Sequence, residues 1–264
     1  MELLTFLGKT LLLRPYVFIF LAIALATSVW LMGKRRTAIF FLLTWATAFV
    51  CEFSSTRTGV PFGWYFYNGT TVGQELYISD VPFMDSLSFS FLLFTSYCLA
   101  LTFLLPAQGR GLGIVMRADR ASRASGPVLG LTVLFFVLLD VVIDPVALRG
   151  DRWFLSKIYY YQEPGVHFGV PIVNYLGWAV VGLVAFGLYQ QIDRHLPDSP
   201  PPAQNVACTL LFGCALYYGI LGFNLAATFW IGEPLIGTTG LLMYLPITAF
   251  LLLRLAGHLP APAA

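Results

Sequence analysis

The chain has 264 residues, of which 58% are hydrophobic and 11% are charged, and its formal net charge is +2. Soluble domains carry about 25% charged residues, so this composition excludes an ordinary soluble protein and indicates an integral membrane protein. The small net charge, without a basic patch that contains interleaved aromatic residues, also excludes a nucleic acid as partner.

Long apolar stretches recur along the chain, and short loops separate them. A helix needs about 20 predominantly apolar residues to cross a bilayer. The pattern predicts one transmembrane domain, residues 1–264, folded as an all-α polytopic bundle. It has about seven spans, at residues 16–32, 38–53, 81–105, 128–146, 170–189, 206–231 and 235–255.

The distribution of Lys and Arg predicts the orientation, because loops rich in these residues stay on the cytoplasmic side. Nine of the 15 Lys and Arg residues follow spans one, three, five and seven, and the first two of these loops carry the strongest bias. We therefore expect a protein of the bacterial inner membrane, with its N-terminus outside and its C-terminus in the cytoplasm.

Two carboxyl groups, Asp140 and Asp144, lie inside the apolar fourth span. Ionisable residues within a membrane span are costly, so they mark a functional site by default. At positions i and i+4 they share one helix face, and a pair with one protonated and one ionised member suits general acid and base work. The alternative is a structural pair, bonded to Asn174, a Tyr or Arg149.

Further polar residues occur at the ends of other spans. Glu52 ends the second span, as either a pocket carboxylate or a helix-end residue at the membrane interface. Asp85 and Asn224 belong to polar stripes on the third and sixth spans, and such stripes often only hold helices together. Asn174 and Trp178, again at i and i+4, lie where the chain re-enters the membrane and are candidates for a pocket.

The two long loops on the predicted outer side share a pattern. One contains Gly59-Val-Pro-Phe-Gly63 and the other Gly165-Val-His-Phe-Gly169, and each leads to a Val-Pro pair that opens the next helix. Such similarity is typical of internal repeats in transporter-like folds. The loop aromatics are predicted to form either an interfacial belt or the roof of a pocket: Trp64, Tyr65, Phe66, Tyr67, Trp153, Phe154, Tyr159, Tyr160 and Tyr161.

Several motifs of other membrane enzymes are missing. The four cysteines form no CxxC pair and the three histidines form no cluster, so we expect no metal site. No lysine lies inside a span, which excludes a retinal Schiff base. There is no phosphate-binding loop of the GxxxxGK[ST] type.

Six groups of residues resemble motifs of the carotenoid biosynthesis family of membrane proteins, over residues 52–182. The third span departs from the family's pattern, because it reads Asp85-Ser-Leu-Ser-Phe where members often have a Trp. The groups are Glu52, Thr58-Gly-Val-Pro-Phe-Gly-Trp-Tyr-Phe-Tyr67, Val81-Pro-Phe-Met-Asp85, Asp140-Val-Val-Ile-Asp-Pro-Val-Ala147, Gly150-Asp-Arg-Trp153 and Phe168-Gly-Val-Pro-Ile-Val-Asn-Tyr-Leu-Gly-Trp178.

The resemblance implies a carotenoid hydratase that adds water to the terminal, ψ-end carbon–carbon double bond of a linear carotenoid, without a cofactor. Protonation of this alkene gives a tertiary carbocation, which water captures. The reaction needs a proton donor, a base for the water, an apolar tunnel and aromatic faces that stabilise the cation. The expected partners are therefore a linear carotenoid, water and membrane lipid.

The residues suit this chemistry in the following way. We expect Asp140 and Asp144 to be the acid–base pair, with Glu52 and Asp85 as further catalytic residues that support it. Asn174 would orient the water, and Arg149 and Arg152 are candidates to activate the acid. The other predicted substrate-binding residues are Trp64, Tyr65, Tyr67, Trp153, Trp178 and Asn224.

Two alternatives stay open at this point. The first is a prenyl-transferring or cyclising membrane enzyme that uses Asp140 and Asp144 with magnesium. The second is a carotenoid- or lipid-binding membrane protein, or a small transporter, in which the carboxyl groups form a proton site.

Overall fold

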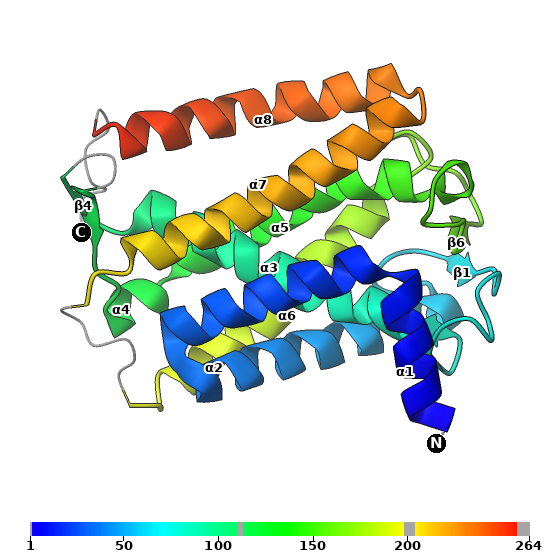
Figure 1. The fold of residues 1–264 in the computed structure, drawn as a ribbon, viewed down its shortest axis with the longest axis horizontal. Coiled ribbons are helices and arrows are strands. Elements are labelled where there is room, and N and C mark those ends of the chain that lie inside the picture. The colour runs from blue at the N-terminus through cyan, green and yellow to red at the C-terminus, as the bar shows by residue number, and fades with distance from the viewer. Residues whose placement is uncertain (1, 110–112, 198–203, 258–264) are drawn as a thin grey trace.

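A computed structural model describes residues 2–109, 113–197 and 204–257 of the chain. Within these ranges, six helices are long and apolar enough to cross a membrane, judged by length and composition. Together they form a single bundle (Figure 1), which confirms the predicted all-α polytopic fold. The six are α2 (Pro15–Thr58), α3 (Phe83–Leu104), α5 (Gly126–Ala147), α6 (Ile172–Asp193), α7 (Ala207–Trp230) and α8 (Pro234–Leu255).

Helix α2 contains the first two predicted spans. A straight helix of its 44 residues would be about 66 Å long, roughly twice the hydrocarbon thickness of a bilayer. The helix instead folds back on itself (Figure 1), at Gly33, whose φ of 79° and ψ of 164° are not helical. The hydroxyls of Ser28 and Thr37 lie 2.9 Å apart across this turn. Counted as two arms, α2 brings the candidate membrane-spanning segments among the described residues from six to seven, the predicted number.

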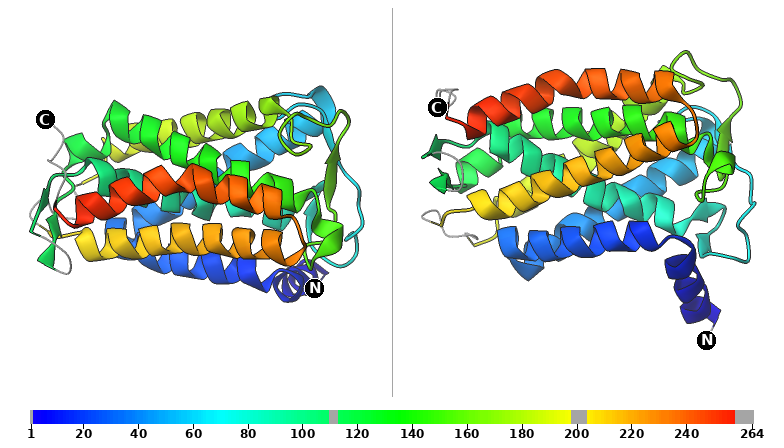
Figure 2. Two further views of the ribbon diagram at one scale, coloured as in Figure 1. Left: turned by 90° about the horizontal axis from the view of Figure 1, so that it is seen from above. Right: turned by 45° about the horizontal axis from the view of Figure 1, so that its top comes forward.

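Short elements lie at the two ends of the bundle. At one end, β1 (Tyr65–Tyr67) pairs antiparallel with β6 (Tyr159–Tyr161), and β2 (Tyr77–Ile78) pairs with β3 (Val81–Pro82). We call this the roof end, and α1 (Glu2–Leu13) also lies there (Figure 2). At the opposite end are the remaining short elements, β4 (Ala107–Gln108), β5 (Val115–Met116) and α4 (Arg120–Arg123). That the roof end faces the cell exterior stays a prediction.

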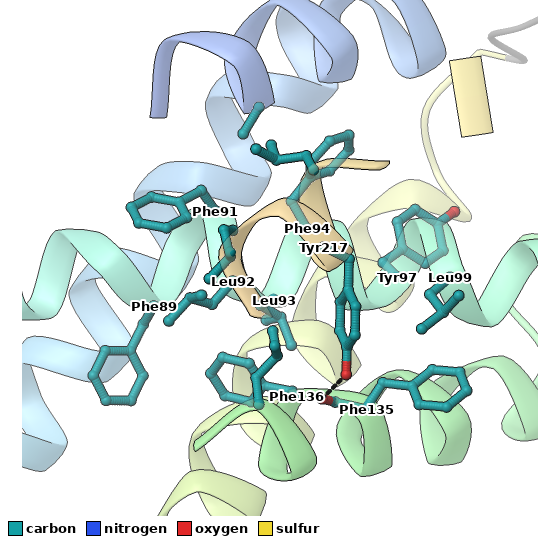
Figure 3. Close-up of a cluster of buried hydrophobic side chains, with 14 of the residues drawn as sticks. Phe89, Phe91, Leu92, Leu93, Phe94, Tyr97, Leu99, Phe135, Phe136 and Tyr217 are labelled. Carbon is teal, nitrogen blue, oxygen red and sulfur yellow. Dashed lines mark hydrogen bonds between the residues drawn. The ribbon is translucent and has the colours of Figure 1, made fainter. Parts of the chain in front are cut away.

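Helix α3 is the centre of the bundle and packs against α2, α5 and α7. Figure 3 shows its apolar side chains enclosed by these neighbours, among them Phe94 and Leu93, which are fully buried. A buried polar group needs a partner where water is absent. Tyr217 of α7 meets this requirement, because its hydroxyl donates to the backbone carbonyl of Phe135 at 2.8 Å.

Helix α7 packs tightly against α3 at Gly213. A Cβ at this position would overlap the Sγ and Cβ atoms of Cys98, whereas a Cβ at Gly219 on the same helix would meet nothing within 4 Å. We expect Gly213→Ala to lower the free energy of unfolding by about 1–3 kcal/mol, the usual cost of overpacking a core. Thermal unfolding in detergent measures this, with Gly219→Ala as control. Equal melting temperatures for the two variants would contradict the close packing.

Candidate active site

Two adjoining cavities lie beneath the roof end of the bundle. The smaller has a volume of about 50 Å³. One water molecule needs about 10–15 Å³ of cavity volume on the same scale, so this cavity has room for water. Its wall is formed by Glu52, Phe62, Tyr65, Tyr67, Asp85, Phe89, Asp144, Tyr159, Tyr161, Asn174 and Trp178. The larger cavity, of about 120 Å³, is mostly apolar and extends between α2, α3, α5 and α7. Residues that belong to both walls are Asp85, Phe89, Asp144, Tyr159 and Trp178.

The end of α5 is shaped by Pro145, which follows Asp144 directly. Proline has no backbone N–H, so the carbonyl of Val141, one turn earlier, loses its helical donor. The Nε2 atom of His167 lies 3.2 Å from this carbonyl and replaces that donor. The second outer loop is thereby attached to α5 beside the two aspartates.

Asp140 and Asp144 are both buried, with 1% and 6% of their surfaces exposed. The side-chain amide of Asn174 donates to Oδ2 of each, at 2.7 Å and 2.9 Å. Tyr161 donates to Oδ2 of Asp144 at 2.6 Å, and Tyr159 donates to Oδ1. These bonds to Asn174 and to the two tyrosines are the ones predicted for a structural pair. Asp144 also borders both cavities, which is the position expected of a functional residue.

Arg149 and Arg152 take no part in this arrangement. Arg149 lies 3.1 Å from Glu233, and Arg152 pairs with the same carboxylate. None of the ion pairs that join described residues includes Asp140 or Asp144. In the described parts of the chain, no three His, Cys, Asp or Glu side chains are grouped so that they could hold a metal ion.

A second pair of carboxyl groups lies across the smaller cavity. Glu52 is only 2% exposed and lines the cavity wall, so of its two predicted alternatives the structure favours a pocket carboxylate. Ser86 donates to its Oε2 atom. The hydroxyl of Tyr67 lies 3.1 Å from Oε1 of Glu52 and 2.8 Å from Oδ2 of Asp85.

Strands β1 and β6 cover the two carboxyl pairs. Side chains alternate between the two faces of a strand, so Tyr65 and Tyr67 face the cavity together with Tyr159 and Tyr161, their partners on β6. Burial raises the pKa of Tyr161, and the neighbouring Asp144 raises it further. The phenol is therefore a neutral hydrogen-bond donor. Of the two possibilities for the loop aromatics, these four tyrosines form a roof.

The other predicted binding residues fall into two groups. Trp178 stacks on Phe89 with ring centroids 4.2 Å apart and borders both cavities. Trp153 and Asn224 line the larger cavity, where the Asn224 amide also donates to the carbonyl of Ile220 in its own helix. Trp64 lies apart from both cavities, is 47% exposed, and stacks on Phe66.

Four residues that line the smaller cavity were missed as site residues in the sequence: Phe62, Phe89, Tyr159 and Tyr161. Ser86, which donates to Glu52, was missed as well. From the sequence, the two tyrosines are predicted only as loop aromatics. Their signal is the run Tyr159-Tyr160-Tyr161, because in a strand the outer two share a face and the middle one is turned away, as its 44% exposure shows. Nothing in the sequence distinguishes Ser86 and Phe89 from the other polar and aromatic residues of span three.

Fold and site together define a polytopic membrane protein in which buried carboxyl groups border an apolar cavity. A sequence model of the carotenoid biosynthesis protein family matches residues 13–246, and the chain belongs to this family. It is similar to the bisanhydrobacterioruberin hydratase of Haloarcula japonica, with 28% identity over 229 residues, which cover 83% of this chain and 68% of that protein. No solved structure matches the chain. The family and this relative support a carotenoid-modifying enzyme.

Proposed function

We propose that the protein is a carotenoid hydratase that adds water to the terminal ψ-end double bond of a linear carotenoid. The observation that carries the proposal is the shared wall of the two cavities. The larger cavity is mostly apolar and suits the tip of a polyene, and the smaller one has carboxyl, phenol and amide groups in its wall that suit water. Asp85 and Asp144 border both, so an alkene and a water molecule would meet beside these carboxyl groups.

The hydrogen bonds support different roles for the two aspartates of α5. Donors directed at a carboxyl group favour its ionised form. Asp144 accepts from Tyr159, Tyr161 and Asn174, so we assign it as the ionised base that activates water. Asp140 accepts from Asn174 and lines the apolar cavity, so we assign it as the neutral acid.

The proposed reaction transfers two protons. Asp140 protonates the alkene CH carbon, and the electron pair of the double bond forms the new C–H bond. The resulting tertiary cation is stabilised by the faces of Trp178 and Phe89, by about 0.5–2 kcal/mol each. Water then forms the C–O bond and gives one proton to Asp144, which leaves a tertiary alcohol. Asp140 must regain a proton, and Asp144 lose one, before the next turnover.

Expression of the protein in cells that make lycopene, followed by mass analysis of the pigments, tests the proposal. A product heavier by one water supports a hydratase. A product with an added prenyl unit would instead support a prenyl transferase, and unchanged pigment that co-purifies with the protein would support a carotenoid-binding protein. Cells with the empty vector are the control.

Trp178 and Trp64 offer a matched comparison of two tryptophans. We expect Trp178→Leu to lower conversion roughly 5- to 30-fold, the kinetic equivalent of about 1–2 kcal/mol of lost cation stabilisation. Trp64→Leu should change conversion by less than about twofold, because that indole lies outside both cavities. Initial rates at equal protein levels measure both. A large loss of conversion in Trp64→Leu would contradict this expectation and would support the original prediction that Trp64 binds the substrate.

A further inference from the structure

The phenol of Tyr67 connects the two carboxyl groups that face the α5 aspartates. Its oxygen lies within hydrogen-bonding distance of Glu52 and Asp85, and the hydroxyl of Tyr65 lies 3.4 Å away. A phenol has one proton to donate and lone pairs with which to accept. Tyr67 therefore donates to one of the carboxyl groups, and the other must donate to Tyr67 if both contacts are full hydrogen bonds.

The alternative, two ionised carboxylates that share one phenolic proton, is costly here. Glu52 and Asp85 approach within about 6 Å of each other, because both contact the same atom. No ion pair between described residues includes either of them, and Arg14, the cation that acts on Asp85, is itself paired with Glu75. Mutual repulsion between two buried carboxyl groups this close favours a state in which one of them keeps its proton.

Tyr67 itself stays a neutral phenol. Burial raises the pKa of its hydroxyl, and the neighbouring Asp85 and Glu52 raise it further. The phenolic proton is thus present, and the additional proton belongs to a carboxyl group. Ser86 donates to Glu52, which favours the ionised form of Glu52 at rest. The resting neutral acid is then Asp85.

We propose that Glu52, Tyr67 and Asp85 form a proton relay from the smaller cavity to the larger, apolar one. Glu52 borders only the smaller cavity, whereas Asp85 borders both. Once Asp85 has given up its resting proton toward Asp140, a proton taken up by Glu52 passes to the oxygen of Tyr67 as Tyr67 passes its own proton to the now ionised Asp85. One O–H bond breaks and one forms at the phenol, so Tyr67 is unchanged and one proton has crossed from Glu52 to Asp85.

The role of the relay in catalysis rests on the proposed hydratase function. In that reaction Asp140 loses a proton to the alkene, while water releases one beside Asp144. The relay takes up a proton on the water side and delivers it to Asp85, which shares the larger cavity with Asp140. Tyr67 is then a positioning and relay residue, and it does not touch the alkene.

Kinetics of the purified protein in lipid test the relay, with Tyr160→Phe as matched control. Tyr160 is the outward residue of β6 and is 44% exposed. We expect Tyr67→Phe to lower kcat roughly 10- to 100-fold with little change in KM, at or below the lower limit for a positioned acid or base, because Tyr67 acts through the carboxyl groups. Tyr160→Phe should keep both constants. An unchanged kcat in Tyr67→Phe, with an active wild type, would overturn the relay.

Infrared spectroscopy of the same samples tests the shared proton without any substrate. A neutral carboxylic acid shows a C=O stretching band that shifts in heavy water. A carboxylate lacks this band. We expect Asp85→Asn to remove one component of this band and exposed Asp151→Asn to keep it. A band unchanged in both Asp85→Asn and Glu52→Gln would overturn the shared proton. A wild type that hydrates no carotenoid would overturn the proposed function. The infrared result would still show whether Glu52 and Asp85 share a proton.

Discussion

Asp144→Asn is expected to lower hydration by about 10²–10⁴-fold, the contribution of a positioned general base. An amide oxygen cannot take the proton of the attacking water, although the side chain keeps its size. Both oxygens of Asp144 accept hydrogen bonds, so the new NH₂ group must face a donor. We expect this mismatch to cost about 1–3 kcal/mol of stability and to leave the protein folded in the membrane.

Pigment analysis in lycopene-producing cells measures the effect on activity, and thermal unfolding in detergent checks the fold. Asp151→Asn is the matched control, since Asp151 is an exposed aspartate of η2 (Gly150–Arg152) at the same end of the bundle. It should retain wild-type conversion. Full activity of Asp144→Asn would remove the assigned acid–base pair, even if the protein proved to be a hydratase.

Glu75→Gln is expected to destabilise the roof end by about 3–5 kcal/mol, the cost of breaking a buried ion pair. Arg14, between α1 and α2, has no exposed side-chain surface and donates to Glu75 at 3.0 Å. The same guanidinium donates to the carbonyl of Leu155, so it joins three separate segments of the chain. Without the carboxylate, a buried positive charge keeps only neutral partners.

Asp80→Asn is the matched control for this loss. Asp80 pairs with Arg57 at 2.7 Å, but 43% and 39% of their side-chain surfaces are exposed, so we expect a change below about 1 kcal/mol. The double variant Arg14→Met with Glu75→Gln should be more stable than Glu75→Gln alone, because it removes the unpaired charge. Thermal unfolding in detergent compares all four proteins. Equal losses of stability in Glu75→Gln and Asp80→Asn would refute the stabilising role of the buried Arg14–Glu75 ion pair.

The membrane helices could be predicted from the sequence, most of their ends to within two residues, although the second arm of α2 and the end of α6 extend four or five residues further than predicted. The reason is physical: in a bilayer every backbone polar group must be bonded internally, so a long apolar stretch has the helix as its simplest solution. The same rule made buried acids conspicuous. Asp140, Asp144, Glu52 and Asp85 could be chosen because a carboxyl group in such a stretch is costly, and the structure brings all four to two adjoining cavities.

The arrangement of the loop aromatics could not be predicted in this way. Trp64 and Tyr65 are neighbours in one motif, yet Tyr65 faces the cavity and Trp64 is turned away from it. Which face of β1 points inward depends on its pairing with β6, a strand from a distant part of the chain. Strand pairing sets such alternation only after the fold brings the two strands together.

The sequence by itself determined that this protein lies in a membrane, which segments cross it, and that acids on α2, α3 and α5 are exceptional. Hydropathy carries that information locally, residue by residue. Only the tertiary structure decided which acids share a partner: Tyr67 joins Glu52 to Asp85, and Asn174 joins Asp140 to Asp144. Hydrogen bonds act over about 3 Å, so the partner of a buried acid depends on helix packing and not on distance along the chain.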